Sequence, residues 1–273
     1  MSDLLLITRD SIPKRLHGAD LGYALRALSL PELLSIEDRF FAQGETRKIP
    51  KSAIALVLPN VIATPTNVDE FATLAEFSLS LLTVSGHPSF FTVATFSGSA
   101  CTHTKHLTRY PSTTTEPKFA ATINGPGVTQ WLQRCLRAQR NLKERMHITA
   151  SRYVRYVRSE NSQDALMDLS ISLESLLDSQ TEISFRFGSC LAKVAGAKGK
   201  KAEDMATLLS DLYDVRSKIA HGDPAAAKLI RQIQPKLPLL HELARRILTI
   251  YMLYLSDHSR DDWKSHLRSS LYA

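Results

Sequence analysis

Cysteine is scarce in this sequence of 273 residues, which has three, at Cys101, Cys135 and Cys190. No two of them stand in a CxxC spacing. This count excludes a disulfide framework and a zinc knuckle built from cysteine pairs, and it is typical of proteins kept in a reducing compartment. We therefore expect a cytoplasmic protein.

Long apolar runs are also missing. The longest, "ILTIYMLYL" at 247–255, has nine residues, about half of the roughly 20 that span a bilayer. The first residues, "MSDLLLITRDSIPKR", hold one short apolar run with charges on both sides, unlike a secretory signal. With 44% hydrophobic and 22% charged residues, the composition is that of a globular protein, and we expect no membrane contact.

The common catalytic and metal-binding signatures are absent. The sequence contains no GxSxG, no HExxH and no paired-carboxylate motif. "CTHTKH" clusters Cys101, His103 and His106, but no fourth ligand lies nearby, so we interpret it as a loop without metal. "AGAKGKKAED" at 195–204 lacks the GxxxxGK[ST] spacing of a phosphate-binding loop, and we interpret it as a solvated loop. No metal and no cofactor is predicted.

Positive charge is concentrated in one half of the chain. The net charge is +7, and residues 1–130 contribute nothing to it, since they hold eleven basic and eleven acidic residues. Residues 131–158 carry eight basic residues against one acidic residue, Glu144. A basic helical face is typical of proteins that bind a polyanion, but an ordinary solvated helix surface has the same composition. Composition leaves both interpretations open.

The two halves of the chain have different patterns, which together predict an α+β protein. Residues 1–127 are expected to form a mixed α/β domain with an antiparallel sheet. Strands are predicted at 52–63, 75–84 and 89–98, the last two as a hairpin across a "GHP" turn. Short helices are predicted at 21–29 and 31–42.

Residues 128–273 are expected to form an all-α domain. The segment 128–158 has no Gly or Pro and predicts one long helix, or two with a kink. Leucines at three- and four-residue spacings predict an amphipathic helix at 162–178. Further helices are predicted at 181–196 (with Thr181 as N-cap), 201–222 and 236–258. The last of these is apolar nearly all round and should be buried on more than one side.

"LYDVRSKIAHGDP" at 212–224 places Arg216 and His221 just before a helix end. Five positions along a straight helix rotate by about 140° and rise about 7.5 Å, so the two side chains would not share a face. They could converge only if His221 lies off the regular helix, which Gly222 at the C′ position would allow. The alternative is structural: a capping histidine and an arginine on a solvated face.

Several segments in the second half occur in an order that resembles the HEPN superfamily, most closely its ApeA-like subgroup. "SLESLL" and "TEISFRF" lie upstream, "RSKIAH" follows, and an apolar helix comes last. ApeA-like members have an Arg-x4–6-His motif in an all-helical domain, and the similarity covers roughly residues 130–260. Where relatives often have a basic residue, this chain has Cys190.

The resemblance implies a homodimer in which the Arg-His segments of two subunits form a composite, metal-independent endoribonuclease site. Arg216 would bind the scissile phosphate, and His221 would act as general acid or base. Glu174 matches a recurring family acid that would orient Arg216, and Ser217 takes the place of a supporting polar residue. The predicted contacts to RNA are Arg152, Arg155, Arg158 and Lys218. Such proteins typically act in phage defence or as toxins.

Two other functions fit the same residues. The first is a HEPN domain that binds RNA or nucleotide without cleaving it. The second is an interaction protein whose helical domain dimerises while residues 1–127 sense a ligand or a phage component. The sequence does not separate these alternatives from a ribonuclease.

Overall fold

In the computed structural model the chain divides into two compact units, Met1–Gln133 and Arg134–Ala273. The residues that the structure describes are 3–8, 25–27, 54–56, 73, 77–78, 80–81, 90–97, 100–104, 131, 134–135, 138, 144–159, 161–177 and 183–272. Most of them belong to the second unit. The helices of that unit position every residue of the predicted site.

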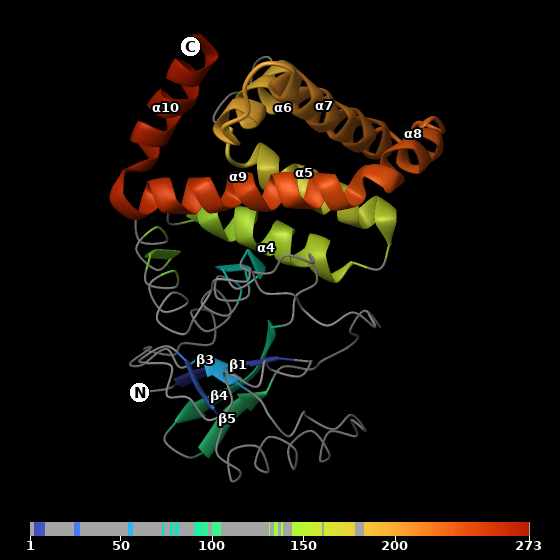
Figure 1. Ribbon diagram of the computed structural model, residues 1–273. Coiled ribbons are helices and arrows are strands. Elements are labelled where there is room, and N and C mark those ends of the chain that lie inside the picture. The colour runs from blue at the N-terminus through green and yellow to red at the C-terminus, as the bar shows by residue number, and fades with distance from the viewer. Residues whose placement is uncertain are drawn as a thin grey trace. The chain divides into compact units, whose positions relative to one another are not determined.

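The described strands of the first unit form two small antiparallel sheets (Figure 1). In the larger sheet, β4 (Phe90–Ser97) lies between β1 (Asp3–Thr8) and β5 (Ala100–Thr104). In the smaller, β2 (Leu25–Ala27) pairs with β3 (Ile54–Leu56). The strands predicted at 52–63 and 89–98 are confirmed at β3 and β4. The assignment of residues 1–127 as one mixed α/β domain lies largely outside the described residues, as does the helix predicted at 31–42.

Two predictions in the first unit are wrong where the structure describes them. Residues 25–27, within the helix predicted at 21–29, form β2. Within the strand predicted at 75–84, Phe77, Ser78 and Ser80 are helical, and the Leu81 amide donates to the Phe77 carbonyl at 3.1 Å. The predicted hairpin therefore does not form, and β4 pairs with β1 and β5 instead.

The error at 75–84 has a physical reason. Phe77 and Leu81 are four residues apart, so they fit one face of a helix as well as one face of a strand. Ser78 and Ser80, read as the exposed positions of a strand, are 1% and 2% exposed. The Ser80 hydroxyl donates to the Phe77 carbonyl at 2.7 Å, which satisfies a polar group within the helix itself.

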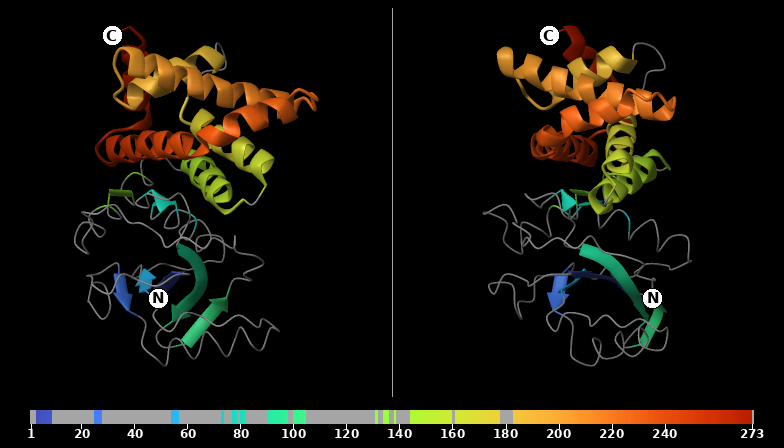
Figure 2. Two further views of the ribbon diagram at one scale, coloured as in Figure 1. Left: turned by 45° about the vertical axis from the view of Figure 1, so that its right-hand side comes forward. Right: turned by 90° about the vertical axis from the view of Figure 1, so that its right-hand side faces the viewer.

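The described part of the second unit is all helical and forms a bundle (Figures 1 and 2). Its elements are α4 (Glu144–Arg158), α5 (Ser162–Glu174), α6 (Ile183–Val194), α7 (Lys200–Ala220), α8 (Ala226–Ile233), η2 (Gln234–Lys236), α9 (Leu237–Asp257) and α10 (Arg260–Tyr272). The predicted helices at 162–178, 181–196, 201–222 and 236–258 are confirmed as α5, α6, α7 and α9. Thr181 lies outside the described residues.

The bundle contains two helical hairpins, α4 with α5 and α6 with α7, whose helices run side by side in every view (Figures 1 and 2). α9 packs against α5, α6 and α7. It also reaches α4, because His241 Nδ1 lies 3.1 Å from the Tyr156 hydroxyl. Burial raises the pKa of the Tyr156 hydroxyl, so this tyrosine remains neutral and serves as a packing group.

α9 is the central helix of the bundle. Its buried residues come in neighbouring pairs at three- and four-residue intervals, which makes a wide buried face: Leu240, His241, Leu243, Ala244, Ile247, Leu248, Tyr251, Met252, Leu255 and Ser256. The expectation that this helix is buried on more than one side is confirmed. None of the described helices combines the length and the apolarity that crossing a bilayer requires.

Two helices were not predicted, α8 and α10. α8 is short and stands between Pro224 and Pro235, which mask its pattern. α10 is mostly polar, and only Trp263 and Leu267 are buried along its described length. Its start follows a capping box that the sequence does contain. The Asp262 carboxylate accepts from the Ser259 amide at 2.9 Å, and the Asp262 amide donates to the Ser259 hydroxyl at 3.3 Å.

Candidate functional site

The C-terminal end of α7 places His221 outside the regular helix. His221 is the C-cap residue, and Gly222 after it has φ +64°. The Gly222 amide donates to the Ile219 carbonyl at 3.1 Å, and the Asp223 amide donates to the Lys218 carbonyl at 2.9 Å. These two bonds form a Schellman motif, which needs the left-handed backbone that glycine adopts without strain. The helix end predicted at Gly222 is confirmed, and the His221 side chain is exposed.

Asp223 fixes the turn that follows. Its carboxylate accepts from the Ala225 amide at 2.8 Å and pairs with Lys218 Nζ at 2.6 Å. The hydrogen bond from Lys218 holds the pKa of the Asp223 carboxyl below its usual value and raises the pKa of the lysine. Lys218, a predicted RNA contact, thus forms an ion pair within its own chain. Its side chain is still 45% exposed, so the ammonium can meet a second anion.

Arg216 is held by two residues, Glu174 of α5 and Tyr213 of its own helix. Its Nη2 lies 3.1 Å from Glu174 Oε2 at the end of α5, and its guanidinium carbon lies 5.8 Å from the centre of the Tyr213 ring. The Tyr213 ring in turn packs against Phe187 of α6, with 5.4 Å between ring centres. The pairing of Glu174 with Arg216 expected from the sequence is therefore present in the structure.

The Arg216–Glu174 ion pair is close but not fully hydrogen-bonded. Within the described residues, Arg216 Nε and Glu174 Oε2 are shielded from solvent and form no hydrogen bond. The 3.1 Å separation satisfies an ion pair, while the direction of approach does not satisfy a hydrogen bond. Because Nε is shielded, a further anion could meet Arg216 only through the exposed part of its side chain, which is 28% exposed.

Arg216 and His221 are not joined to one another within one chain. In the described part of the protein no hydrogen bond links them, and the two side chains differ in environment. The Arg216 side chain is 28% exposed and held in place, whereas that of His221 is exposed. The Ser217 carbonyl accepts from the His221 amide at 3.1 Å, so Ser217 contributes to the end of the helix through its backbone.

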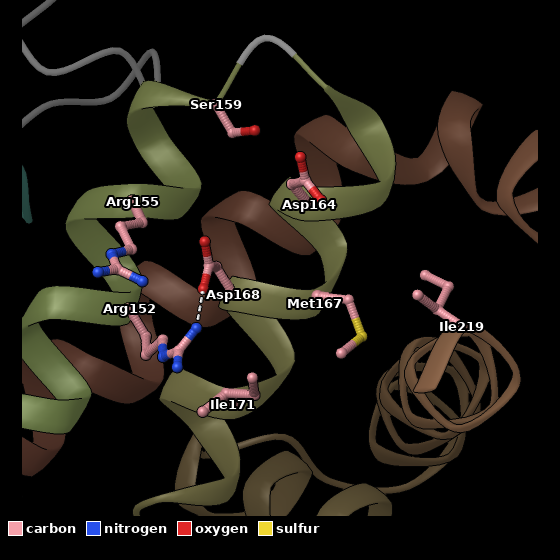
Figure 3. Close-up of a pocket in the computed structure, with 8 residues that line it drawn as sticks. All are labelled: Arg152, Arg155, Ser159, Asp164, Met167, Asp168, Ile171 and Ile219. Atoms are coloured by element: carbon pink, nitrogen blue, oxygen red, sulfur yellow. Dashed lines mark hydrogen bonds and ion pairs between the residues drawn. The ribbon is translucent and has the colours of Figure 1, made fainter. Parts of the chain in front are cut away.

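A pocket of about 580 Å³ opens beside this helix end, between α4, α5 and α7 (Figure 3). Arg152 and Arg155 of α4 form one wall, and Asp164 and Asp168 of α5 face them. Arg152 Nη1 donates to Asp168 Oδ1 at 2.7 Å. Ser159, just after α4, completes the polar side.

The rest of the pocket lining is apolar. Met167 and Ile171 come from α5 and Ile219 from α7, and in Figure 3 the Met167 side chain extends toward Ile219. Ile219 stands between Arg216 and His221 in the sequence, so the pocket reaches the predicted motif along α7.

The structure brings some predicted site residues together and leaves others apart. Arg152 and Arg155 share the pocket, and Arg216 and Glu174 share an ion pair. The side chain of Arg158 lies outside the described residues. Sequence reasoning missed six pocket residues, Ser159, Asp164, Met167, Asp168, Ile171 and Ile219. The four-residue spacing of the two aspartates was the available signal, since it puts both on one face of α5.

Other reactive groups in the described part of the chain do not form a second site. No cluster of three histidine, cysteine or acidic side chains there could hold a metal ion. Cys190 is buried on α6, and burial raises the pKa of its thiol. A buried thiol with a raised pKa is a packing group rather than a nucleophile.

Comparison with known proteins gives no match, either to family models, to curated proteins or to solved structures. The resemblance to HEPN domains therefore rests on the sequence motifs alone.

Proposed function

We propose that the helical unit is a metal-independent endoribonuclease of the HEPN type, with Arg216 and His221 as its catalytic residues. The observation that carries the proposal is the end of α7. An arginine anchored by Glu174 and Tyr213 is followed by an exposed histidine that Gly222 releases from the helix. Anchoring suits a phosphate-binding group, and exposure suits a group that exchanges protons with a substrate.

The proposed chemistry is transfer of the scissile phosphate to the neighbouring 2′-hydroxyl. A histidine takes the proton of the 2′-hydroxyl, and the 2′ oxygen bonds to phosphorus. The P–O5′ bond then breaks, and the 5′ oxygen receives a proton from a second acid. The fork of donors on Arg216 stabilises the charge that builds up on the other phosphate oxygens. The pKa of an ordinary histidine lies near neutrality, which suits both proton transfers.

A homodimer would supply both halves of this chemistry. Within one chain no hydrogen bond joins Arg216 to His221 in the described structure, and one histidine cannot be acid and base at once. Two copies related by a two-fold axis, meeting through residues 203–258, would bring two Arg216 and two His221 side chains together. Light scattering of the intact protein at micromolar concentration should show a dimer, and a strict monomer would rule out the composite site.

The decisive experiment is cleavage of labelled RNA with and without EDTA, beside His221→Ala. We expect cleavage that is insensitive to EDTA, that leaves a cyclic phosphate, and that is lost in the variant. The matched control is His258→Ala, because His258 is the exposed C-cap residue of α9. Replacing an exposed C-cap residue costs at most about 1 kcal/mol, so both variants should stay folded. Equal activity of the two variants would contradict the proposal.

A second candidate function is binding of RNA or nucleotide without cleavage. The pocket favours it, because Arg152, Arg155 and the apolar wall are assembled without Arg216 or His221. Charge reversal at Arg152 and Arg155 should weaken RNA binding and flatten its salt dependence under either function. Binding with no cleavage by the wild-type protein would leave this candidate in place. A cytoplasmic setting in phage defence or a toxin system is proposed from the resemblance alone.

A further inference from the structure

We infer that the pocket between α4, α5 and the end of α7 is a subsite for one nucleotide of the RNA strand. The inference deepens the proposed function and rests on it for the identity of the strand. Neither Arg216 nor His221 lines the pocket, so the two proposals can fail separately.

The two walls of the pocket call for a ligand with both a charged and an apolar part. One wall carries two arginines and two aspartates, so its formal charges cancel. A simple phosphate groove would instead be lined by positive charge. The other wall is formed by Met167, Ile171 and Ile219, which offer an apolar surface to a flat ring. A volume of about 580 Å³ is within the usual range for a small-molecule site.

The two arginines differ in what they can bind. Arg152 is paired with Asp168, whose side chain is only 14% exposed, so this pair forms a fixed part of the wall. Arg155 is exposed, and within the described part of the chain it forms no ion pair. Its guanidinium therefore has its donors available for a phosphate. We assign the phosphate of the bound nucleotide to Arg155.

Asp164 separates a nucleotide from other amphipathic anions. This carboxylate is exposed at the polar rim of the pocket, and when ionised it only accepts hydrogen bonds. A phosphodiester group or a fatty-acid carboxylate offers it no donor and is repelled. A nucleotide offers the hydroxyls of its ribose and the amino group of its base. The combination of Arg155, Asp164 and the apolar wall thus matches the three parts of a nucleotide.

The position of Ile219 links the pocket to the proposed cleavage site. Ile219 lies three residues after Arg216 and two before His221 on the same helix end. A strand whose base packs against Ile219 would continue directly toward these two residues. The subsite would hold a nucleotide next to the scissile phosphate and so fix the register of the strand.

The test is calorimetric titration of the full-length His221→Ala protein with AMP, ribose 5-phosphate, adenosine and inorganic phosphate. We expect AMP to bind and each fragment to bind at least about tenfold more weakly, because each contacts only part of the pocket. Arg155→Gln should weaken AMP binding by about ten- to a hundredfold. The matched control Arg268→Gln, an exposed arginine of α10, should stay within about twofold.

The apolar wall is tested with Ile171→Ser, which should weaken AMP binding by about tenfold and leave phosphate binding unchanged. Ile148→Ser is the control, because Ile148 is 45% exposed on α4 and does not line the pocket. Thermal melting checks that each variant is folded. Phosphate binding as tight as that of AMP would overturn the inference. So would equal effects of Arg155→Gln and Arg268→Gln, or no AMP binding at about 10 mM.

A competition experiment separates RNA from free nucleotide. A short single-stranded RNA should displace AMP from the pocket, and failure to do so would overturn the assignment to an RNA strand. If the wild-type protein cleaves RNA but AMP does not bind, the subsite is wrong and the ribonuclease stands. If AMP and RNA bind as expected but nothing is cleaved, the subsite stands and the ribonuclease is wrong.

Discussion

The two helical hairpins of the bundle are held together in different ways. Between α4 and the end of α5, hydroxyl-bearing residues form hydrogen bonds. The Ser172 hydroxyl donates to the Thr149 carbonyl at 2.8 Å, and the hydroxyls of Thr149 and Ser175 lie 2.6 Å apart. Between α6 and α7 the contact is steric. A Cβ added at Gly188 would lie 2.5 Å from Ser210 Oγ and 3.0 Å from the Ala206 carbonyl oxygen.

The two hairpins also carry different parts of the candidate site. The polar hairpin presents the ionic wall of the pocket, where Arg152 and Asp168 add one more polar link between α4 and α5. The tightly packed hairpin positions α7, whose end bears the Arg-His motif. Glu174, at the end of α5, connects the two by its ion pair with Arg216. We therefore expect changes in the first hairpin to affect mainly binding and changes in the second to affect mainly chemistry.

The largest expected effect separates chemistry from binding. Arg216→Lys keeps the charge but loses the planar fork, so kcat for RNA cleavage should fall by about 100- to 1,000-fold. Arg155→Gln should raise KM by about tenfold and leave kcat within about twofold. Steady-state kinetics with labelled RNA measures both. Loss of kcat in both variants would remove the distinction between the two hairpins.

Gly188→Ala should be the most damaging conservative change to the packing. The added methyl group meets Ser210 and Ala206 of α7, and overpacking of this kind costs about 1–3 kcal/mol, more than alanine gains as a better helix former. The free energy of unfolding is measured in urea. Adding Ser210→Ala should recover part of the loss, because it removes the nearest atom. If Gly188→Ala were more stable than the wild type, the helices could accommodate the added methyl group without cost.

Thr149→Val tests the polar hairpin. The Ser175 hydroxyl donates to the Ser172 carbonyl at 2.6 Å, so the Thr149 hydroxyl must donate its own proton to Ser175. Removing that donor should lower the free energy of unfolding by about 1 kcal/mol. Thr207→Val is the control, because among the described residues its exposed hydroxyl donates only to the Glu203 carbonyl of its own helix, at 2.9 Å. Similar losses in the two variants would mean that the hydroxyl network contributes nothing specific.

The smallest expected effect concerns the turn after the motif. The folded pKa of Asp223 lies below its ordinary value of 3.8, so its stabilising contribution is present above that pH and is lost as the pH falls through the folded pKa. Asp223→Asn keeps the acceptor for Ala225 and removes the charge that Lys218 meets. The wild-type protein should melt slightly higher at pH 7, and the difference should shrink as the pH falls below 3.8 through the lowered pKa of Asp223. A constant difference across this range would contradict the assignment.

Local signals predicted the helices that have clear ends and a clear apolar face. α5 shows its leucine stripe, and α7 ends where Gly222 allows the left-handed turn. α10 was not predicted, because only two of its residues are buried and it shows no apolar stripe. Its capping box was nevertheless visible in the sequence at Ser259. The strand predicted at 75–84 failed because so short an apolar run fits either period.

The candidate site was predictable only where local signals along the chain define it. The positions of Arg216 and His221 follow from the helix end, and the partner Glu174 came from the resemblance. The pocket depends on how α4 lies across α5 and on Ile219 arriving from α7. The pocket could not be predicted from residue spacing, because contacts between separate helices arise only from tertiary packing.

The buried Trp263 of α10 gives the bundle a late step in folding. Its indole nitrogen donates to the Leu176 carbonyl at 3.0 Å, across a separation of 87 residues. The helical hairpins join close neighbours and can form quickly, while closing so long a loop carries the greatest entropic cost. On the ribosome, the end of α5 keeps an unsatisfied carbonyl until α10 has been synthesised. A nascent chain stalled before α10 would therefore lack this long-range bond, although α9 and the Glu174–Arg216 ion pair already join the two hairpins.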